Sequence, residues 1–184
     1  ADDHRPNVLL IAVDDLNDWI GCLGGHPQTI TPNFDRLANS GVLFTNAHCP
    51  APACNPCRSA VFTGRAPNVS GLYDNRQAMR EIMPDAKINP QYIREHGYRA
   101  AGSGKLLHFF IDAACWDEYF PKAASENPFP QSFYPQQREV NLPRGGPWQY
   151  VETDWAALDV TDAEFGGDWS VTEYIAVQLT QDHD

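Results

Sequence analysis

The sequence lacks any apolar run of about 18 residues, the length that a membrane-spanning helix needs. We therefore expect neither a membrane-spanning segment nor a membrane partner. Internal repeats and low-complexity tracts are also missing. The opening residues, A-D-D-H-R-P-N, show no charged-then-apolar leader, and they fit the new end that removal of a signal peptide leaves. With 184 residues, the chain is long enough for one domain with its own core.

Lysine and arginine are scarce in the last part of the chain. Residues 111–184 hold 3 basic and 14 acidic side chains, whereas residues 1–110 hold 10 of each, so the net charge of −11 arises after residue 110. Nucleic-acid binding depends on the neutralisation of phosphates by lysine and arginine. This balance argues against a nucleic-acid partner. An anionic substrate would need a local binding site, because the overall field does not attract it.

Cysteine is present in an odd number, so at least one cysteine has no partner within the chain. One modified cysteine and two disulfides would suit an exported protein, and five thiols would suit a reducing compartment. The count alone leaves both open. The five cysteines are Cys22, Cys49, Cys54, Cys57 and Cys115.

An unbroken apolar run, N-V-L-L-I-A-V, fills residues 7–13 and predicts a strand buried on both faces, as in a parallel sheet. Asp14 and Asp15 follow it directly. Carboxylates at the carboxyl end of such a strand lie where α/β proteins build their sites. A polar turn that caps the next helix is the alternative interpretation.

Strand and helix signals alternate up to about residue 110, and this alternation predicts an α/β fold. Prolines stand at the predicted helix starts and glycines at the predicted ends, as is typical of helices. The predicted elements are a helix over residues 30–41, a strand over 42–47, a short helix ending at Gly64, and a helix followed by a strand within 88–105.

The periodicity ends after about residue 110. Residues 111–168 are rich in proline, acidic and aromatic residues, and we expect an irregular, acidic insertion there. A last helix is predicted from Ser170, as its N-cap, to about Gln181, because apolar residues recur there at helical spacing.

Two cysteines, a proline and an arginine stand at the start of the short helix, in A-C-N-P-C-R (residues 53–58). Cys54 and Cys57 form a C-x-x-C, which can be a redox pair at a helix N-terminus or half of a zinc site. The redox interpretation also needs a thioredoxin-like βαβ frame. A zinc site needs a second pair of ligands, and the sequence has no second C-x-x-C and no H-x-x-x-H. A structural cysteine pair is a third alternative.

The segment C-N-P-C-R-S-A-V-F-T-G-R also resembles the signature of the sulfatase family, C-x-P-S-R followed by four residues and T-G. Three further motifs occur in the family's order within residues 5–110. R-P-N-V-L-L-I-A-V-D-D-L resembles its opening strand with two metal-binding aspartates, and T-P-N-F-D-R-L-A resembles the helix that follows. G-K-L-L-H resembles its G-K-x-H or G-K-x-x-H element. The wider spacing in that element, with G-R-A-P and L-Y-D, is most similar to the iduronate-2-sulfatase branch.

This resemblance implies an α/β fold of the alkaline-phosphatase-like kind, a three-layer sandwich with a mostly parallel central sheet. Family members are much longer, so residues 1–184 would be the N-terminal part of one catalytic domain, with the missing C-terminal part as a partner. The resemblance further implies hydrolysis of sulfate monoesters of a small molecule or glycan, such as a sulfated carbohydrate. A secreted, periplasmic or lysosomal-type compartment is expected.

The resemblance also implies the cofactors. In the family the first motif cysteine, here Cys54, is oxidised by a formylglycine-generating enzyme to formylglycine, which works as its hydrate. One hydroxyl of the hydrate attacks sulfur, and the other allows sulfate to be expelled. The implied ligands of one Ca²⁺ ion are Asp14, Asp15 and the modified residue 54. Three such groups are too few to hold calcium tightly, so we expect weak binding and little activity from this chain alone.

Three further residues receive catalytic roles from the resemblance. Arg58 lies four residues after Cys54, on the same helix face, and would steady the hydrate. Lys105 would hold a sulfate oxygen as a point charge. His108 would assist at residue 54 or at the leaving oxygen.

One position departs from the family signature, because Cys57 stands where the family usually has serine. In the family, conversion depends mainly on the cysteine, the proline and the arginine of the signature, and all three are present here. We therefore expect Cys54 to be converted. The alternative is that the two close thiols pair with each other. Two alternative functions remain. One is a formylglycine-dependent phosphonate or phosphodiester hydrolase. The other is a non-catalytic secreted module in which Cys54 and Cys57 form a structural pair.

Overall fold

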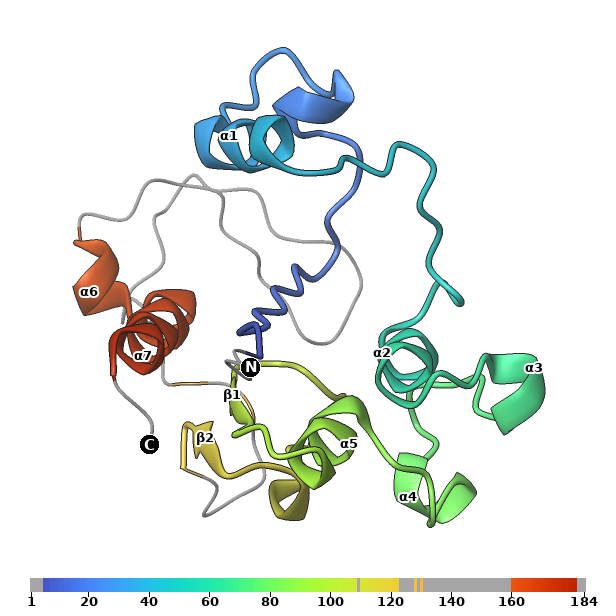
Figure 1. The fold of residues 1–184 in the computed structure, drawn as a ribbon. Coiled ribbons are helices and arrows are strands. Elements are labelled where there is room, and N and C mark those ends of the chain that lie inside the picture. The colour runs from blue at the N-terminus through green and yellow to red at the C-terminus, as the bar shows by residue number, and fades with distance from the viewer. Residues whose placement is uncertain (1–4, 109, 123–127, 129, 131–159, 182–184) are drawn as a thin grey trace, which may run out of the picture. The chain divides into compact units, whose positions relative to one another are not determined.

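A computed structural model describes residues 5–108, 110–122, 128, 130 and 160–181. The chain forms two compact units, Ala1–Cys49 and Pro50–Asp184 (Figure 1). Across the described ranges, every helix is too short or too polar to traverse a bilayer.

The first unit has two regular elements within its described residues, η1 (Gly21–Leu23) and α1 (Pro32–Ser40). The start of α1 at Pro32 and its end before Gly41 confirm the helix predicted over residues 30–41. The hydroxyl of Thr31 accepts a hydrogen bond from the amide of Gly21 at 2.8 Å, so it connects α1 to η1.

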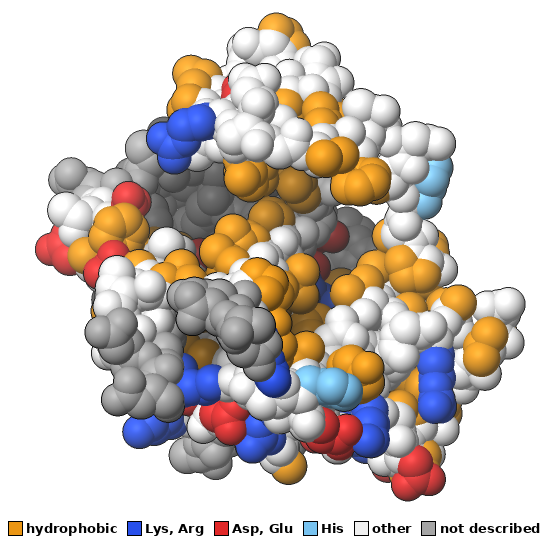
Figure 2. All heavy atoms as spheres, in the orientation of Figure 1, with side chains coloured by type: hydrophobic (Ala, Val, Ile, Leu, Met, Phe, Trp, Pro, Cys, Tyr) orange, Lys and Arg blue, Asp and Glu red, His pale blue; other side chains and the backbone are white. Residues whose placement is uncertain are grey.

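The buried strand predicted over residues 7–13 is wrong for this structure, and so is the strand over residues 42–47. Both segments lack regular secondary structure, and their side chains are exposed, with Val8 at 76% and Val42 at 80%. An extended segment becomes a strand only when another backbone pairs with it, and the described part of this unit offers no strand. Hydrophobic side chains consequently lie at the surface around α1 (Figure 2).

The second unit begins with helices whose ends follow the predicted signals. Helix α2 ends at Gly64, whose left-handed backbone (φ 69°) lets its N–H donate to the carbonyl oxygen of Ala60 at 2.8 Å. Helix α5 carries Pro90 in its first turn, as expected for the helix within residues 88–105. The four helices are α2 (Cys54–Thr63), α3 (Pro67–Ser70), α4 (Met79–Ile82) and α5 (Asn89–Glu95).

A parallel two-stranded sheet, made of β1 (Ala101–Ser103) and β2 (Glu118–Phe120), follows α5. β1 confirms the strand predicted within residues 88–105. β2 and the short helix η2 (Ala113–Cys115) show that the irregular insertion predicted for residues 111–168 contains regular elements. Pairing with β1 makes β2 a strand, although its own three residues are too few to show an alternating pattern.

Two helices close the described chain, α6 (Asp162–Phe165) and α7 (Asp168–Thr180). α6 also lies in the segment expected to be irregular, whereas residues 123–127, 129 and 131–159 of that segment lie outside the described residues. α7 confirms the predicted last helix, but its N-cap is Gly167 and not Ser170. Gly167 has a φ of 55°, which glycine adopts without steric cost, so the helix can begin earlier than the sequence pattern suggested.

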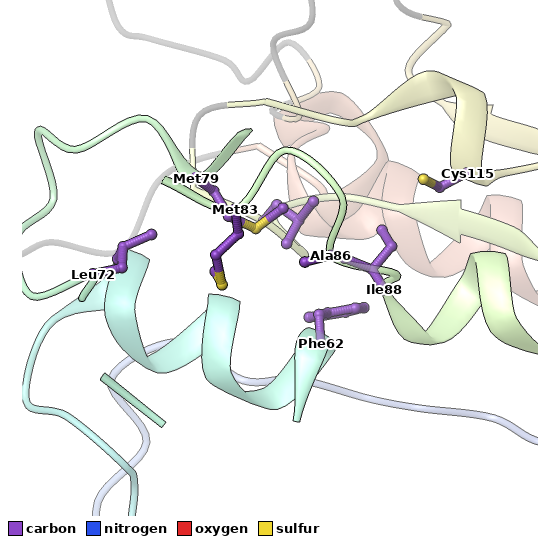
Figure 3. Close-up of a cluster of buried hydrophobic side chains, with 8 residues drawn as sticks. Phe62, Leu72, Met79, Met83, Ala86, Ile88 and Cys115 are labelled. Carbon is purple, nitrogen blue, oxygen red and sulfur yellow. The ribbon is translucent and has the colours of Figure 1, made fainter. Parts of the chain in front are cut away.

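The core of the second unit joins α2 to the segment after β1. Its buried side chains point toward one another from α2, from the region around α4 and from the segment before α5 (Figure 3). Burial of each large apolar side chain contributes about 1.5–3 kcal/mol, so this cluster fixes those segments together. The cluster comprises Phe62, Leu72, Met79, Met83, Ala86, Ile88, Leu107 and Cys115.

Candidate active site around Cys54

Cys54 is the first residue of α2 and is half-buried. The preceding Ala53 is extended, and its carbonyl oxygen accepts a hydrogen bond from the amide of Cys57 at 3.0 Å. The side chain of Cys54 therefore projects from the first turn of a helix of 10 residues. The first turn of a helix is the positive end of the helix dipole, which favours a negative charge nearby.

Asn55 fixes the orientation of this first turn. Its side chain is buried, and its amide nitrogen donates to the carbonyl oxygens of Asp74 at 3.2 Å and Gln77 at 2.6 Å. Its backbone N–H donates to the side chain of Asn75 at 2.9 Å. A buried amide that loses its hydrogen bonds costs free energy. These contacts therefore hold α2 against the loop before α4. Sequence analysis missed Asn55, since a single asparagine beside a proline carries no signal of burial.

Lys105 reaches Cys54 from the end of β1. The strand stops at Ser103, and Gly104 turns the chain with a φ of 70°, a conformation that favours glycine. The amide of Gly104 donates to the carbonyl oxygen of Phe120 at 3.2 Å, which anchors the turn to β2. Nζ of Lys105 then lies 3.7 Å from Sγ of Cys54. The structure thus brings together two motifs that are far apart in the sequence.

Arg58 contacts the backbone of the same turn. Its Nη1 atom donates to the carbonyl oxygen of Lys105 and, at 3.3 Å, to that of Leu106. The guanidinium therefore supports the loop that carries the lysine. Its predicted role toward the side chain of residue 54 stays a prediction.

Tyr119 of β2 also holds the turn at Gly104 in place. Its hydroxyl donates to the carbonyl oxygen of Gly104. Burial raises the pKa of Tyr119 above its ordinary value, so the phenol keeps its proton and stays a donor. A side chain at position 104 would meet Val171 of α7 at 3.2 Å, which is a second reason for glycine there.

His108 follows Lys105 on the same segment and is half-buried, and its Nδ1 atom is fully enclosed by protein. The segment that carries Lys105 therefore also carries the imidazole that the resemblance implies. Its action at residue 54 or at a leaving oxygen stays a prediction.

Asp14 and Asp15 form a turn after the apolar segment of the first unit, and both are exposed. Asp15 has a φ of 53°, which is uncommon outside glycine but better tolerated by aspartate. Carboxylate oxygens suit calcium, which takes about 6–8 oxygen ligands. Within the described ranges, no group of three or more His, Cys, Asp or Glu side chains gathers that could hold a metal ion. The donor type fits calcium, but the number of donors falls short.

Comparison with known proteins adds an independent finding. The family model described as Sulfatase matches residues 6–182. A protein named sulfatase from Formosa agariphila is 41% identical over 165 residues, which cover 86% of this chain and 32% of that protein.

Two mammalian proteins are similar over shorter stretches. Mouse iduronate 2-sulfatase is 39% identical over 113 residues, which cover 61% of this chain and 20% of the mouse protein. Bovine arylsulfatase A is 50% identical over 105 residues, which cover 54% of this chain and 20% of the bovine protein. The chain thus spans about a third or less of the length of these relatives.

Proposed function

The chain belongs to the sulfatase family, and on that premise we propose that the complete protein hydrolyses sulfate monoesters. One observation carries the proposal: Nζ of Lys105 lies 3.7 Å from Sγ of Cys54 at the start of α2. This contact puts a cation beside the residue that the family motif marks for conversion. A sulfated carbohydrate is the proposed substrate, supported by the similarity to a protein named iduronate 2-sulfatase.

We propose that a formylglycine-generating enzyme converts Cys54 to formylglycine. The half-buried position of Cys54 at a helix start fits such a residue, because the side chain is reachable and lies at the positive end of the helix dipole. A formylglycine hydrate supplies two hydroxyls on one carbon, one to attack sulfur and one to allow release of sulfate.

The remaining roles belong to the chain's own side chains. Lys105 and the positive end of the α2 dipole attract the anionic sulfate oxygens, and their charge is directed at the site before the substrate arrives. Arg58 keeps the loop of Lys105 in place through the two carbonyl oxygens it contacts. His108 is the proposed proton donor to the leaving oxygen.

The proposed metal is one Ca²⁺ ion held by Asp14, Asp15 and residue 54, with further ligands from the rest of the complete protein. Calcium would supply positive charge beside the site. An alkaline-phosphatase-like three-layer sandwich and a secreted, periplasmic or lysosomal-type location belong to the same proposal.

Replacement of the lysine tests the proposed role. In the complete, converted protein, we expect Lys105→Ala to lower kcat for an aryl sulfate by about 10²–10³-fold, the typical cost of removing one group that stabilises developing charge. Lys105→Arg should recover part of that loss because it keeps the charge. Lys122→Ala, which changes an exposed lysine, is the matched control. A loss for Lys105→Ala no larger than for this control would contradict the assignment.

Two measurements separate the alternatives. Mass spectrometry of the peptide that contains Cys54, with hydrazide trapping of an aldehyde, distinguishes the enzyme from a non-catalytic module with intact thiols. The relative turnover of sulfate, phosphate and phosphonate esters by the complete protein then distinguishes a sulfatase from a phosphonate or phosphodiester hydrolase.

A further inference from the structure

The proposed function makes no use of Cys57, although its position relative to Cys54 is well defined. The two cysteines begin α2 three residues apart, and both are half-buried thiols. Residues at this spacing share a helix face, with Cα atoms about 5 Å apart. Disulfides join Cα atoms about 4.4–6.8 Å apart. A bond between the two sulfur atoms therefore fits the first turn without a change in the helix backbone.

The two residues between the cysteines hold the turn in place. Asn55 and Pro56 are both buried, and the side chain of Asn55 is bonded to the carbonyl oxygens of Asp74 and Gln77. Because these residues face the protein interior, Cys54 and Cys57 are left at the more accessible side of the same turn. Closing a bond there costs little conformational entropy, since the backbone is already fixed.

We propose that Cys57 is a resolving thiol for Cys54. In the presence of a low-molecular-weight disulfide such as glutathione disulfide, the two cysteines form a disulfide, and Cys54 is withheld from conversion. This last consequence rests on the proposed function. The ammonium group of Lys105, 3.7 Å from Sγ of Cys54, favours the approach of an anionic reagent such as glutathione disulfide.

The exchange balances in two steps. The sulfur of Cys54 attacks glutathione disulfide, which forms a mixed disulfide and releases one glutathione. The sulfur of Cys57 then attacks the Cys54 sulfur, so the mixed disulfide breaks and the second glutathione leaves. Two electrons pass from the cysteine sulfurs to glutathione disulfide, and the two thiol protons end on the two glutathione molecules.

The first experiment uses the full chain made in a host that lacks the converting enzyme. The chain is equilibrated in glutathione buffers of increasing disulfide content, quenched with acid and alkylated, and the tryptic peptide between Arg36 and Arg58 is sequenced by mass spectrometry. That peptide also contains Cys49, so every sample carries Cys49→Ser. We expect the peptide to lose two hydrogens and to carry no glutathione, with the new bond joining Cys54 and Cys57.

The matched variant is Cys57→Ser, which restores the residue of the family signature. It cannot resolve the mixed disulfide, so we expect Cys54 to retain one glutathione in the same buffers. The proposal is overturned if glutathione remains on Cys54 in the protein with Cys57 as often as in Cys57→Ser. It is equally overturned if no bond joins Cys54 and Cys57 in the most oxidising buffer.

The second experiment tests the consequence for conversion. Oxidised and reduced chains are incubated in air with formylglycine-generating enzyme and ascorbate, a reductant without a thiol that supplies the two further electrons O2 needs to become water, and aldehyde is trapped with a hydrazide. We expect at least a tenfold lower aldehyde yield from the oxidised chain, with full recovery after reduction. Equal yields would overturn the protective role. A further outcome is that neither the reduced chain nor reduced Cys57→Ser gives aldehyde. This outcome would contradict the proposed function but not the disulfide, which the first experiment tests separately.

Discussion

Two side chains, Asn55 and Lys105, each fix part of the candidate site through contacts with distant segments of the chain. Asn55 is 2% exposed because its amide is bonded to a loop some twenty residues further along the chain. Local sequence patterns report helical or strand periodicity, but they carry no signal of which distant carbonyl oxygen an amide contacts. The approach of Lys105 to Cys54 is a similar case, since it was expected from the family resemblance and not from the residues themselves.

Cys115 leads to a prediction at the same scale. Burial, and then its hydrogen bond to Asp112 at 3.3 Å, raise the pKa of the Cys115 thiol from 9.0 to about 11, although Arg80 opposes the shift. The folded chain therefore holds this proton more tightly than the unfolded chain. Its contribution to stability is complete below pH 9 and is lost as the pH rises through about 11.

Urea unfolding between pH 8 and pH 11 checks this prediction. We expect the free energy of unfolding to fall over that range, and to fall less steeply in Cys115→Ala. Part of the decline should remain in the variant, because burial also raises the pKa values of Tyr119 and Tyr174. Cys49→Ala, which changes an exposed cysteine, should keep the original slope. Identical slopes in the two variants would contradict the role of Cys115.

At the scale of elements, helices were predicted more reliably than strands. α1 and α2 are followed by glycines, and α1 and α5 carry a proline in the first turn, so local residues decide where these helices start and stop. A strand depends on a partner that the sequence does not name. Residues 7–13 have the composition of a buried strand but lack a pairing strand in the described part of their unit, whereas β2 has little pattern of its own and forms by pairing with β1.

The close contact between β1 and β2 gives a prediction for Gly102. A Cβ atom at this position would lie 2.6 Å from the ring of Tyr119 and 2.8 Å from the ring of Trp116. We expect Gly102→Ala to lower the free energy of unfolding by about 1–3 kcal/mol, the usual cost of overpacking. Chemical denaturation measures it. Gly41→Ala is the matched change, because its Cβ would lie 3.5 Å from its nearest neighbour, the carbonyl oxygen of Leu37. Equal losses would show that Tyr119 and Trp116 move aside freely.

At the scale of the whole molecule, the chain covers about a third of the Formosa agariphila relative, and its described residues show a sheet of only two strands. The apolar segments of the first unit are exposed for a related reason. A hydrophobic run is buried only where packing partners are available. The α/β class was therefore predictable from the alternation of elements, while the three-layer sandwich with a mostly parallel central sheet stays a prediction.

Calcium binding is the prediction that belongs to this scale. Asp14 and Asp15 supply two carboxylates, and a third ligand at residue 54 requires conversion. We expect calorimetry on this chain to give a dissociation constant of about 10⁻⁴ M or weaker, because calcium needs about 6–8 oxygen ligands. The double change Asp14→Asn and Asp15→Asn should weaken the binding further. Tight binding of one ion per chain would show that the chain already contains a complete ligand set.

The turn at Gly104 follows β1 directly and packs against α7. Its carbonyl oxygen is held by Tyr119, and the space above its α-carbon is occupied by the methyl groups of Val171. A sideways displacement of α7 would therefore reach the backbone that carries Lys105 and alter the gap between its ammonium nitrogen and the sulfur of Cys54. Mutations in α7, remote in sequence from both motifs, should accordingly change the distance between Lys105 and Cys54 without replacing any side chain of the site.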